Sequence, residues 1–360
     1  MGRFILKRLI YGFLVMLGVI VITFFLFNIL PGDPARMILG QRADIASVEA
    51  INKDLGRDKP LGIQFMNYLN DLSPISFHNT TDPASSNFFD RAKYTSAIPL
   101  FRISRSTVVA LKEPYLRRSY QSRKPVGEIL FDGFVNTAIL AVVAMTFAMI
   151  LGIAIGIVCA VYKNTFIDRL ALVFSVLGMS LPSFFAAILF AWIFAFLLAD
   201  ITHLNMAGSL FSVDDFGRGE YLDLKNLILP AVTLGIRPLG IIVELTRNSL
   251  LEVLSQDYIR TARAKGLSRF TILTRHALKN ALNPVVTAVS GWLASLLAGA
   301  VFVEYIFDWK GIGLVIVNAL EKYDFPVLMG ALLYISVLLV IINILVDIVY
   351  GMLDPRVRVH

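Results

Sequence analysis

Six apolar stretches constrain this chain more than any other feature, because each is long enough to cross a lipid bilayer. They fall at residues 9–30, 134–162, 170–199, 227–246, 282–303 and 327–350, and about 20 apolar residues suffice for a spanning helix. Hydrophobic residues make up 57% of the chain and charged residues 16%, whereas soluble domains carry about 45–50% and about 25%. The sequence therefore predicts an all-α polytopic membrane protein, and it disfavours a soluble domain, a disordered chain and a nucleic-acid-binding module.

The uneven distribution of Lys and Arg predicts which side of the membrane each loop occupies. The loop at 247–280 has seven basic and two acidic residues, whereas the loops at 200–226 and 304–326 have two basic residues each against five and four acidic ones. Cytoplasmic loops carry the basic excess, and a long loop crosses largely regardless of its charge. With six spans, both termini are then cytoplasmic, and residues 31–133 form a large extracytoplasmic loop.

The expected organisation has four parts. They are an N-terminal span at 1–30, an extracytoplasmic region at 31–133, a five-span core at 134–350 with a cytoplasmic loop at 247–281, and a cytoplasmic tail at 351–360. The first span is too long for the apolar region of a cleaved signal peptide, so we expect it to remain as an anchor. In the extracytoplasmic region we expect a small ordered element, helical in part around Ser47–Leu69, and a looser segment around Ser73–Ser106, where nothing is periodic.

Residues for membrane-enzyme chemistry are missing from the sequence or misplaced in it. There is no phosphate-binding GxxxxGK[ST] loop and no HExxH motif, the four histidines lie outside the expected spans, and the one aspartate inside a span is Asp347. The single cysteine, Cys159, excludes an internal disulfide and disfavours a cysteine metal site. We therefore expect no catalytic residue, no metal and no cofactor bound by this chain.

The loop at 247–281 contains the segment that is most informative about function. Its side chains at positions 258, 259, 262, 266 and 270 fall within about 120° of one helical face, with basic residues on the flanks. We expect a short helix that ends or bends at Gly266, because glycine is a poor helix former. Such a helix suits docking into a groove on a partner protein. An amphipathic helix resting on anionic lipid has the same pattern, and the spacing alone leaves both interpretations open.

This loop resembles the signature of permease subunits of ABC importers, the segment that enters a cleft on the ATPase subunit. The general family pattern is Glu-Ala-Ala, three residues, then Gly; here Arg260, Thr261 and Ala262 precede Gly266 in that register. The form Arg-Thr-Ala-Arg-Ala-Lys-Gly-Leu is similar to that of the peptide-importer branch. Further motifs follow the order of that branch: Pro31-Gly32-Asp33-Pro34, Leu229-Pro230-Ala231, Leu245-Thr246-Arg247, Glu304 with Gly311-Ile312-Gly313, and Asp354-Pro355-Arg356. The chain resembles the B-type permease of dipeptide, oligopeptide and nickel importers.

The resemblance implies a type I (MetI-like) permease core that forms half of a translocation pathway in the bacterial plasma membrane. It implies as partners a homologous second permease, two ATPase subunits that hold ATP and Mg, an extracytoplasmic binding protein, membrane lipid and a peptide substrate, but no nucleic acid. The ATPase-coupling residues it implies are Tyr258, Arg260, Thr261, Ala262, Arg263, Ala264, Lys265, Gly266 and Leu267. Nickel or another small solute is an alternative substrate, and an ATPase-independent channel or scaffold is an alternative of a different class.

Two positions depart from the family pattern. Lys310 stands where the family usually has Pro before the Gly-x-Gly, which leaves the geometry of that turn open. The segment Asp71–Leu111 resembles an insertion relative to compact members, and the resemblance does not indicate its role.

Two charged residues lie in the fourth expected span. An arginine at the bilayer centre costs at least about 2.5–3.5 kcal/mol, so Arg237 should face a cavity or a partner. Glu244 lies seven residues further, on the same helical face. One interpretation is that both line the translocation pathway. The other is that they pair with other spans or with the second permease, with Arg247 competing for Glu244.

Overall fold

The computed structural model describes residues 2–29, 59–82, 85, 87–91, 93–94, 96–214, 219–297 and 300–353, with side chains for all of these except 2–5, 28–29 and 347–353. The chain divides into two compact units. The core unit consists of Met1–Ile5, Asp132–Leu314 and Leu338–His360, and the flanking unit consists of Leu6–Phe131 and Val315–Val337. Each unit is described by itself below.

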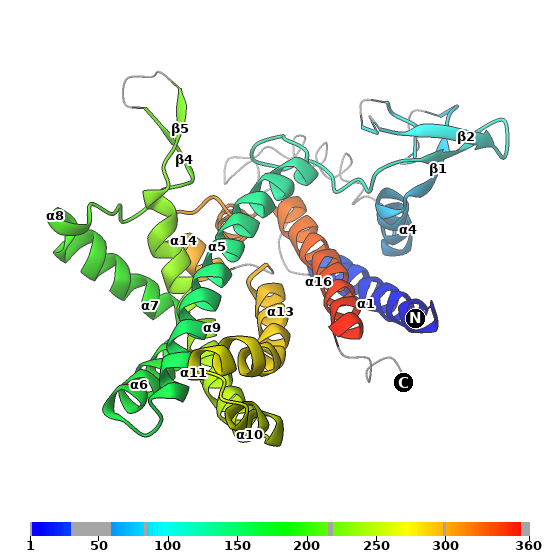
Figure 1. Ribbon diagram of the computed structural model, residues 1–360. Coiled ribbons are helices and arrows are strands. Elements are labelled where there is room, and N and C mark those ends of the chain that lie inside the picture. The colour runs from blue at the N-terminus through cyan, green and yellow to red at the C-terminus, as the bar shows by residue number, and fades with distance from the viewer. Residues whose placement is uncertain are drawn as a thin grey trace. The chain divides into compact units, whose positions relative to one another are not determined.

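Four of the described helices are long and apolar enough to cross a membrane (Figure 1). They are α1 (Gly2–Ile29), α5 (Val126–Val161), α9 (Lys225–Leu254) and α16 (Phe325–Leu353). A fifth candidate is the pair formed by α6 (Phe166–Ser180) with α7 (Ser183–Phe190) and the π-helix η1 (Ala191–Leu197), which is bent by 110° at the break between them. The helical membrane architecture predicted from the sequence is confirmed at this level.

Two of the six apolar stretches are not single helices. The stretch 170–199 is broken at Leu181, which is extended (ψ 129°), and Pro182 caps α7. Proline lacks a backbone N–H and drives the preceding residue out of the helical region, so hydropathy alone predicts the wrong shape here. In the stretch 282–303, α13 (Asn283–Leu297) covers 15 residues and α14 (Val301–Ile306) follows separately.

Close helix contacts in the core unit depend on glycine. Gly152 and Gly156 of α5 lie against Ile242 and Thr246 of α9. A Cβ added at Gly152 would lie 2.8 Å from Cγ2 of Ile242, and one added at Gly156 would lie 2.6 Å from Cβ of Thr246. Small residues four apart allow two membrane helices to approach closely, and here they bring α5 onto α9. After η1, α8 (Ala199–Thr202) leads to a hairpin of β4 (Phe211–Val213) and β5 (Glu220–Leu222).

A fully buried carboxylate holds α14 to α5 and to the start of α15 (Ile312–Glu321). Glu304 accepts hydrogen bonds from Thr137 Oγ1 at 2.7 Å and from the Gly313 amide at 2.6 Å. The Thr137 hydroxyl in turn accepts from the Ile312 amide at 2.9 Å. A Cβ at Gly311 would collide with the Glu304 carboxylate, so this position requires glycine.

The turn at Lys310, where the family usually has proline, is held by α5. Asn136 Nδ2 donates to the Lys310 carbonyl at 3.0 Å, and the Trp309 indole donates to the Asn136 carbonyl at 3.0 Å. These two hydrogen bonds define the turn without the rigidity of a proline ring.

In the flanking unit, aromatic side chains bring together α1, α4 (Leu61–Leu72) and α16. Phe24 of α1 lies 5.0 Å from Phe65 and 5.6 Å from Tyr68 between ring centroids, and Leu333 of α16 is buried with them. Just before α16 begins, the Asp324 carboxylate accepts from the Tyr120 amide at 3.0 Å and from the Ser119 hydroxyl. The segment before α5 is thereby attached to the turn before α16.

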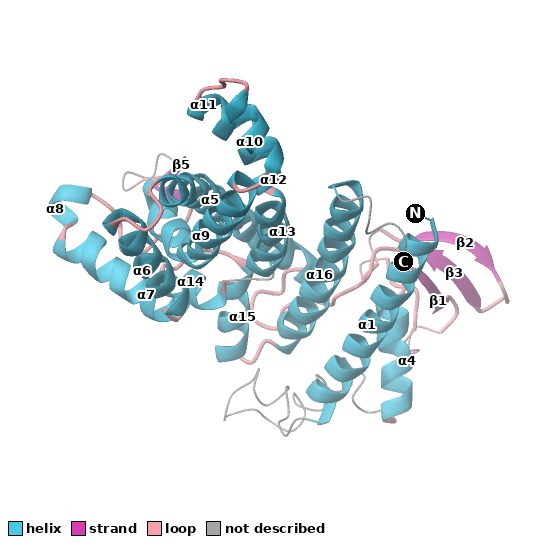
Figure 2. Cartoon of the chain, turned by 60° about the horizontal axis from the view of Figure 1, so that its bottom comes forward, coloured by secondary structure: helices cyan, strands magenta, loops and turns pink. Residues whose placement is uncertain are grey.

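A three-stranded antiparallel sheet follows α4 (Figure 2). It consists of β1 (Ile75–Asn79), β2 (Ile98–Arg102) and β3 (Thr107–Leu111) in the order β1-β3-β2. The expectation of a looser segment at Ser73–Ser106 is therefore wrong. Each strand has five residues, too few for local periodicity to predict it, and β1 pairs with β3 from the far end of the segment. The expected helix around Ser47–Leu69 overlaps α4, and residues 47–58 lie outside the described part of the chain.

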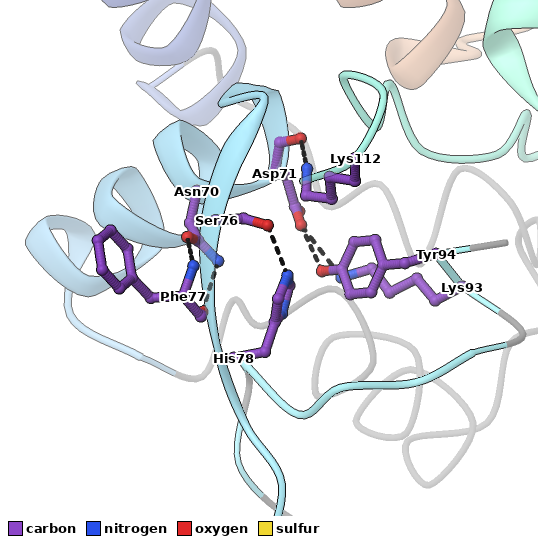
Figure 3. Close-up of polar contacts among 8 residues, drawn as sticks. All are labelled: Asn70, Asp71, Ser76, Phe77, His78, Lys93, Tyr94 and Lys112. Atoms are coloured by element: carbon purple, nitrogen blue, oxygen red, sulfur yellow. Dashed lines mark hydrogen bonds and ion pairs between the residues drawn. The ribbon is translucent and has the colours of Figure 1, made fainter. Parts of the chain in front are cut away.

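The inner side of this sheet carries a buried polar cluster around Asp71 (Figure 3). The Tyr94 hydroxyl donates to Asp71 Oδ1 at 2.7 Å, Lys93 Nζ lies 3.3 Å from the same oxygen, and Lys112 donates to the Asp71 carbonyl. Burial, with help from the nearby Lys112 charge, lowers the pKa of His78 from 6.5 to about 4. Burial also lowers the pKa of Lys112 from 10.5 to about 8, against the opposing effect of Asp71.

Candidate coupling site

The segment singled out in the sequence forms a short helix held against the core unit. Helix α10 (Asp257–Ala264) begins after Gln256, which is extended at ψ 150°. Ile259 is fully buried and Ala262 is 7% exposed, and both join a cluster with Leu250 of α9 and Ile272. The side of α10 that carries Ile259 and Ala262 therefore packs against other parts of the same chain.

Gly266 ends the helix by its backbone conformation, as the sequence predicted. Its φ is +75°, in the left-handed region that favours glycine. The Gly266 amide donates to the Arg263 carbonyl at 3.0 Å, and the Leu267 amide donates to the Ala262 carbonyl at 3.3 Å. This pair of bonds is the Schellman arrangement, which satisfies the last carbonyls of a helix.

The remaining candidate residues face outward. Those exposed in the chain are Tyr258, Arg260, Thr261, Arg263, Ala264, Lys265, Gly266 and Leu267. Of the five residues that the sequence pattern groups on one helical face, Ile259 and Ala262 are buried, whereas Tyr258, Gly266 and Phe270 are exposed. Phe270 lies beyond the end of α10, in α11 (Arg269–Thr271), so the helical phase of α10 does not extend to it. Tyr258 lies within α10 itself and is 42% exposed.

A second contact fixes α10 to the helices that follow it. Asn280 Nδ2 in α12 (Leu278–Ala281) donates to the Tyr258 hydroxyl at 2.9 Å. Between the two lies η2 (Ile272–Ala277), a stretch of π-helix, and such stretches are frequent at functional sites. Together with the cluster around Ile259, this bond makes α10, α12 and the end of α9 one mechanical unit.

An ion pair connects the end of α9 to the first turn of α6. Arg247 forms two hydrogen bonds with Asp168, Nε to Oδ1 at 2.6 Å and Nη2 to Oδ2 at 2.8 Å, and their side chains are 15% and 2% exposed. Asp168 also accepts from the Asn164 amide at 2.8 Å. The sequence suggested Glu244 as a partner for Arg247 and did not predict Asp168. The one available signal was an isolated acid in the short basic loop between the second and third spans.

The two charged residues of α9 that were candidates for the pathway are both exposed on the isolated chain. The Arg237 guanidinium carbon lies 6.0 Å from the centre of the Trp292 ring of α13, within range of a cation–π interaction. Arg237 and Glu244 lie seven residues apart, so the helix places them on one side. Asp347 lies in α16 where side chains are not described.

A metal centre is not formed by the part of the chain that the structure describes. Within it, no group of three or more His, Cys, Asp and Glu side chains could hold a metal ion.

Long apolar helices, together with a bent helix pair and a short helix in the longest basic loop, define a polytopic α-helical membrane protein. The family described as the binding-protein-dependent transport system inner membrane component matches residues 152–359, and its N-terminal region matches residues 1–87. The chain belongs to this family. It is a multi-pass protein of the bacterial plasma membrane and a permease subunit of an ABC importer.

Curated relatives match this chain over almost its entire length. The dipeptide transport system permease protein DppB of Alkalihalophilus pseudofirmus is 32% identical, covering 99% of this chain and 100% of the relative. The glutathione transport system permease protein GsiC of Salmonella typhimurium is also 32% identical, covering 99% of each.

A solved structure shares the fold of the permease. A chain of the MetNI methionine ABC transporter, captured in an inward-facing conformation, aligns with a TM-score of 0.50. The alignment covers 63% of this chain and 97% of that chain at 17% sequence identity. The likeness supports the MetI-like permease fold.

Proposed function

We propose that this chain forms half of the translocation pathway of an importer for dipeptides or oligopeptides, and that α10 is its contact with the ATPase. The observation that supports the proposal is that α10 has one buried side and one exposed side. Ile259 and Ala262 pack against the rest of the core unit, whereas Arg260, Arg263 and Lys265 are exposed. The names of the relatives, which are dipeptide and glutathione permeases, favour a peptide substrate.

The remaining partners follow from the family. A homologous second permease would complete the pathway, two ATPase subunits would hold ATP and Mg, and an extracytoplasmic binding protein would deliver the substrate. ATP hydrolysis would take place entirely on the ATPase subunits, so this chain contributes no catalytic residue.

A movement of α10 would be transmitted to the membrane helices through side-chain contacts. ATP binding would close the ATPase dimer and move α10, and the buried cluster with Leu250 would pass that movement to α9. The Arg247–Asp168 pair would pass it on to α6. The energy comes from the difference in ATP affinity between the two arrangements of the assembly, and the permease responds by a rigid-body transition.

The topology we propose has six crossings with both termini in the cytoplasm. The third crossing would be the bent pair of α6 with α7 and η1, and the fifth would be α13 continued by α14. Residues 31–133 would be extracytoplasmic, 134–350 would form the permease core and 351–360 the cytoplasmic tail. The basic excess of the 247–280 loop supports this orientation.

We further propose that Arg237 and Glu244 line the pathway. Both are exposed on the isolated chain although they lie within a helix of mean hydropathy 1.7 that could span the membrane. Exposure to lipid would be costly, so a water-filled cavity or a partner subunit should cover them. A peptide's carboxylate and amine would then find opposite charges on one side of α9.

The coupling proposal is tested with a substitution on the outward side of α10. Ala262→Asp is unsuitable by itself, because Ala262 is buried and the change would also disturb packing. Leu267→Asp changes an exposed position (38%), and Leu224→Asp, also exposed (58%), is the matched control outside the loop. Leu267→Asp should reach the membrane in normal amounts but lose copurifying ATPase and ATP-driven uptake, whereas Leu224→Asp should retain the ATPase. Equal ATPase retention by both variants contradicts the proposal.

The alternative of an ATPase-independent channel or scaffold makes the opposite prediction. In that case the natural protein would purify without an ATPase, and substrate would equilibrate across vesicles without ATP. Uptake assays with a dipeptide, a tripeptide and nickel as competing substrates separate the peptide proposal from transport of nickel or another small solute.

A further inference from the structure

The exposed surface of α10 has two unlike flanks. Successive residues of an α-helix lie about 100° apart around its axis, and the buried Ile259 and Ala262 define the direction that faces the chain's own core. Arg263 and Arg260 then lie on one side of the helix, at about 70° and about 130° from that direction. Both are exposed, and we name this pair the arginine flank.

The opposite flank of α10 is turned toward the rest of the loop. Tyr258 lies about 70° from the buried direction on that side, and its hydroxyl accepts a hydrogen bond from Asn280 of α12 at 2.9 Å. Within the described part of the chain, no hydrogen bond or ion pair joins the side chain of Arg260 or Arg263 to a residue outside α10. The arginine flank is therefore the side of α10 that is left open.

The positive charge of the arginine flank is not neutralised within α10. Arg260 Nη1 lies 3.4 Å from Asp257 Oδ1, but the two side chains are 74% and 95% exposed, and an exposed pair of this kind is weak. Residues 257–265 contain three basic residues against this one acid. Cations in the last turn of a helix are favoured by its dipole, which accounts for Arg263 and Lys265. Arg260 lies in the middle of the helix, so its charge is available to a partner.

The apolar surface of α10 does not suit it to lie on a bilayer. Interfacial helices bury large apolar side chains in the boundary between headgroups and acyl chains and carry their basic residues on the opposite side. In α10 the apolar side chains Ile259 and Ala262 are already packed against other parts of the core unit. The side opposite to them carries Asp257 and Ala264, which offer no large apolar group. This surface favours a groove on a protein over lipid as the partner of the arginine flank.

We propose that the groove of the ATPase that receives α10 carries carboxylates on the wall that meets the arginine flank. The inference rests on the proposed function, because the partner is the ATPase assigned there. An arginine binds a carboxylate by two parallel hydrogen bonds, and complementary charges across an interface speed association and exclude wrong partners. Asp257 competes with this wall for Arg260, since it lies beside Arg260 on the same helix.

The salt dependence of ATPase retention tests the proposal on the full-length permease in nanodiscs. The permease is immobilised with its copurified ATPase, washed, and the retained ATP hydrolysis is measured. Retention by the natural chain should fall several-fold between about 0.1 M and about 1 M potassium chloride, because the Debye length shortens from about 10 Å to about 3 Å over that range. Retention that is independent of salt overturns the proposal.

Substitution of the two arginines assigns the effect to the arginine flank. The double variant Arg260→Gln and Arg263→Gln keeps long polar side chains at exposed positions, so α10 should remain packed. It should retain several-fold less ATPase than the natural chain at the lower salt concentration and lose most of the salt dependence. Arg169→Gln, at an exposed position of the loop before α6, is the matched control and should behave as the natural chain. Equal retention by the double variant and the control overturns the proposal.

Removal of the competing acid should have the opposite effect. Asp257→Asn frees Arg260 from its exposed partner, so ATPase retention at the higher salt concentration should rise about two-fold or more. A purely structural role for Asp257, as an acid that favours the first turn of α10, predicts lower retention instead. Unchanged or lower retention would overturn the competition between Asp257 and the ATPase.

The remaining outcomes separate this inference from lipid binding and from the proposed function. The variants are compared in nanodiscs of phosphatidylglycerol and in nanodiscs of phosphatidylcholine. An effect of the arginine substitutions that is confined to phosphatidylglycerol would show that headgroups meet the arginine flank, and it would overturn the proposal. Loss of the ATPase from the natural chain already at the lower salt concentration would overturn the proposed coupling as well, whereas retention without an arginine effect overturns this inference alone.

Discussion

The backbone conformation of one residue, Gly266, determines how the candidate coupling helix α10 ends. Gly266 adopts φ +75°, and no atom lies within 4 Å of the Cβ that a substitution would add. The cost of replacing this glycine is therefore conformational and not steric. A substitution of Gly266 by a small residue therefore changes the backbone conformation without disturbing side-chain packing, because the added side chain contacts no other residue of the chain.

Gly266→Ala should loosen the end of α10 by about 1 kcal/mol, because an alanine in the left-handed region is strained. Gly266→Asn should cost less, since asparagine tolerates this conformation. Hydrogen exchange of the amides at 263–267 measures the difference. Equal exchange in the natural chain and the alanine variant would show that the cap does not depend on glycine.

His78 gives the flanking unit a defined response to acid. Its pKa is about 4 in the folded chain against 6.5 when unfolded, mainly because it is buried and secondarily because of Lys112. Between these two values the unfolded state binds more protons, so the stability is complete above about pH 6.5 and decreases as the pH falls toward about 4.

Exchange of the β1 and β3 amides, corrected for the intrinsic pH effect, should therefore speed up between about pH 7 and about pH 5. His78→Gln removes the titrating ring and should flatten this dependence. The same slope in both proteins would assign the response to another group.

At the scale of elements, two buried carboxylates connect helices that are far apart in sequence. Asp168 joins α6 to Arg247 of α9, and Glu304 joins α14 to α5 and to the first residues of α15. In each case the acid has several donors, so its removal leaves more than one group without a partner. Buried donors that lose their acceptor are costly.

Asp168→Ala should destabilise the core unit by about 3 kcal/mol or more, because it leaves the Arg247 charge largely buried and unpaired. Asp257→Ala is the control, since the exposed Asp257–Arg260 pair (3.4 Å) should contribute little. Thermal stability of the purified protein measures both. The double variant Asp168→Ala with Arg247→Met should recover part of the loss, and no recovery would count against the pair.

Glu304→Ala should also destabilise the protein, by about 2–3 kcal/mol, because the Thr137 hydroxyl and the Gly313 amide lose their acceptor. Glu304→Gln keeps one acceptor oxygen and should cost less. A smaller loss for the alanine variant than for the glutamine variant in the same melting experiment would contradict this account of the carboxylate.

At the scale of the whole molecule, the proposed topology predicts opposite accessibility for two exposed positions. In the Cys159→Ala background, Ser122→Cys should react with an impermeant maleimide added to intact cells, because it precedes α5 on the extracytoplasmic side. Lys265→Cys, next to α10, should react only after the membrane is opened. Labelling of both positions in intact cells would contradict the six-crossing arrangement.

The sequence by itself determined the features that need only composition or one residue's backbone. Apolar length predicted the positions of α1, α5, α9 and α16, because a span requires little beyond hydropathy. Gly266 predicted the end of α10, because the left-handed conformation is a local property. The order of motifs predicted the family that the comparisons then showed.

Only the tertiary structure decided the features that depend on distant partners. Arg247 pairs with Asp168, 79 positions away in the sequence, and not with the nearby Glu244. Ile259 and Ala262 are buried against other residues of the same chain. The strands β1 and β3 lie near opposite ends of the insertion and pair with each other, and strands of five residues are too short for local periodicity to predict them. These outcomes depend on the free energy of groups brought together by the whole fold, and local sequence does not specify which groups those are.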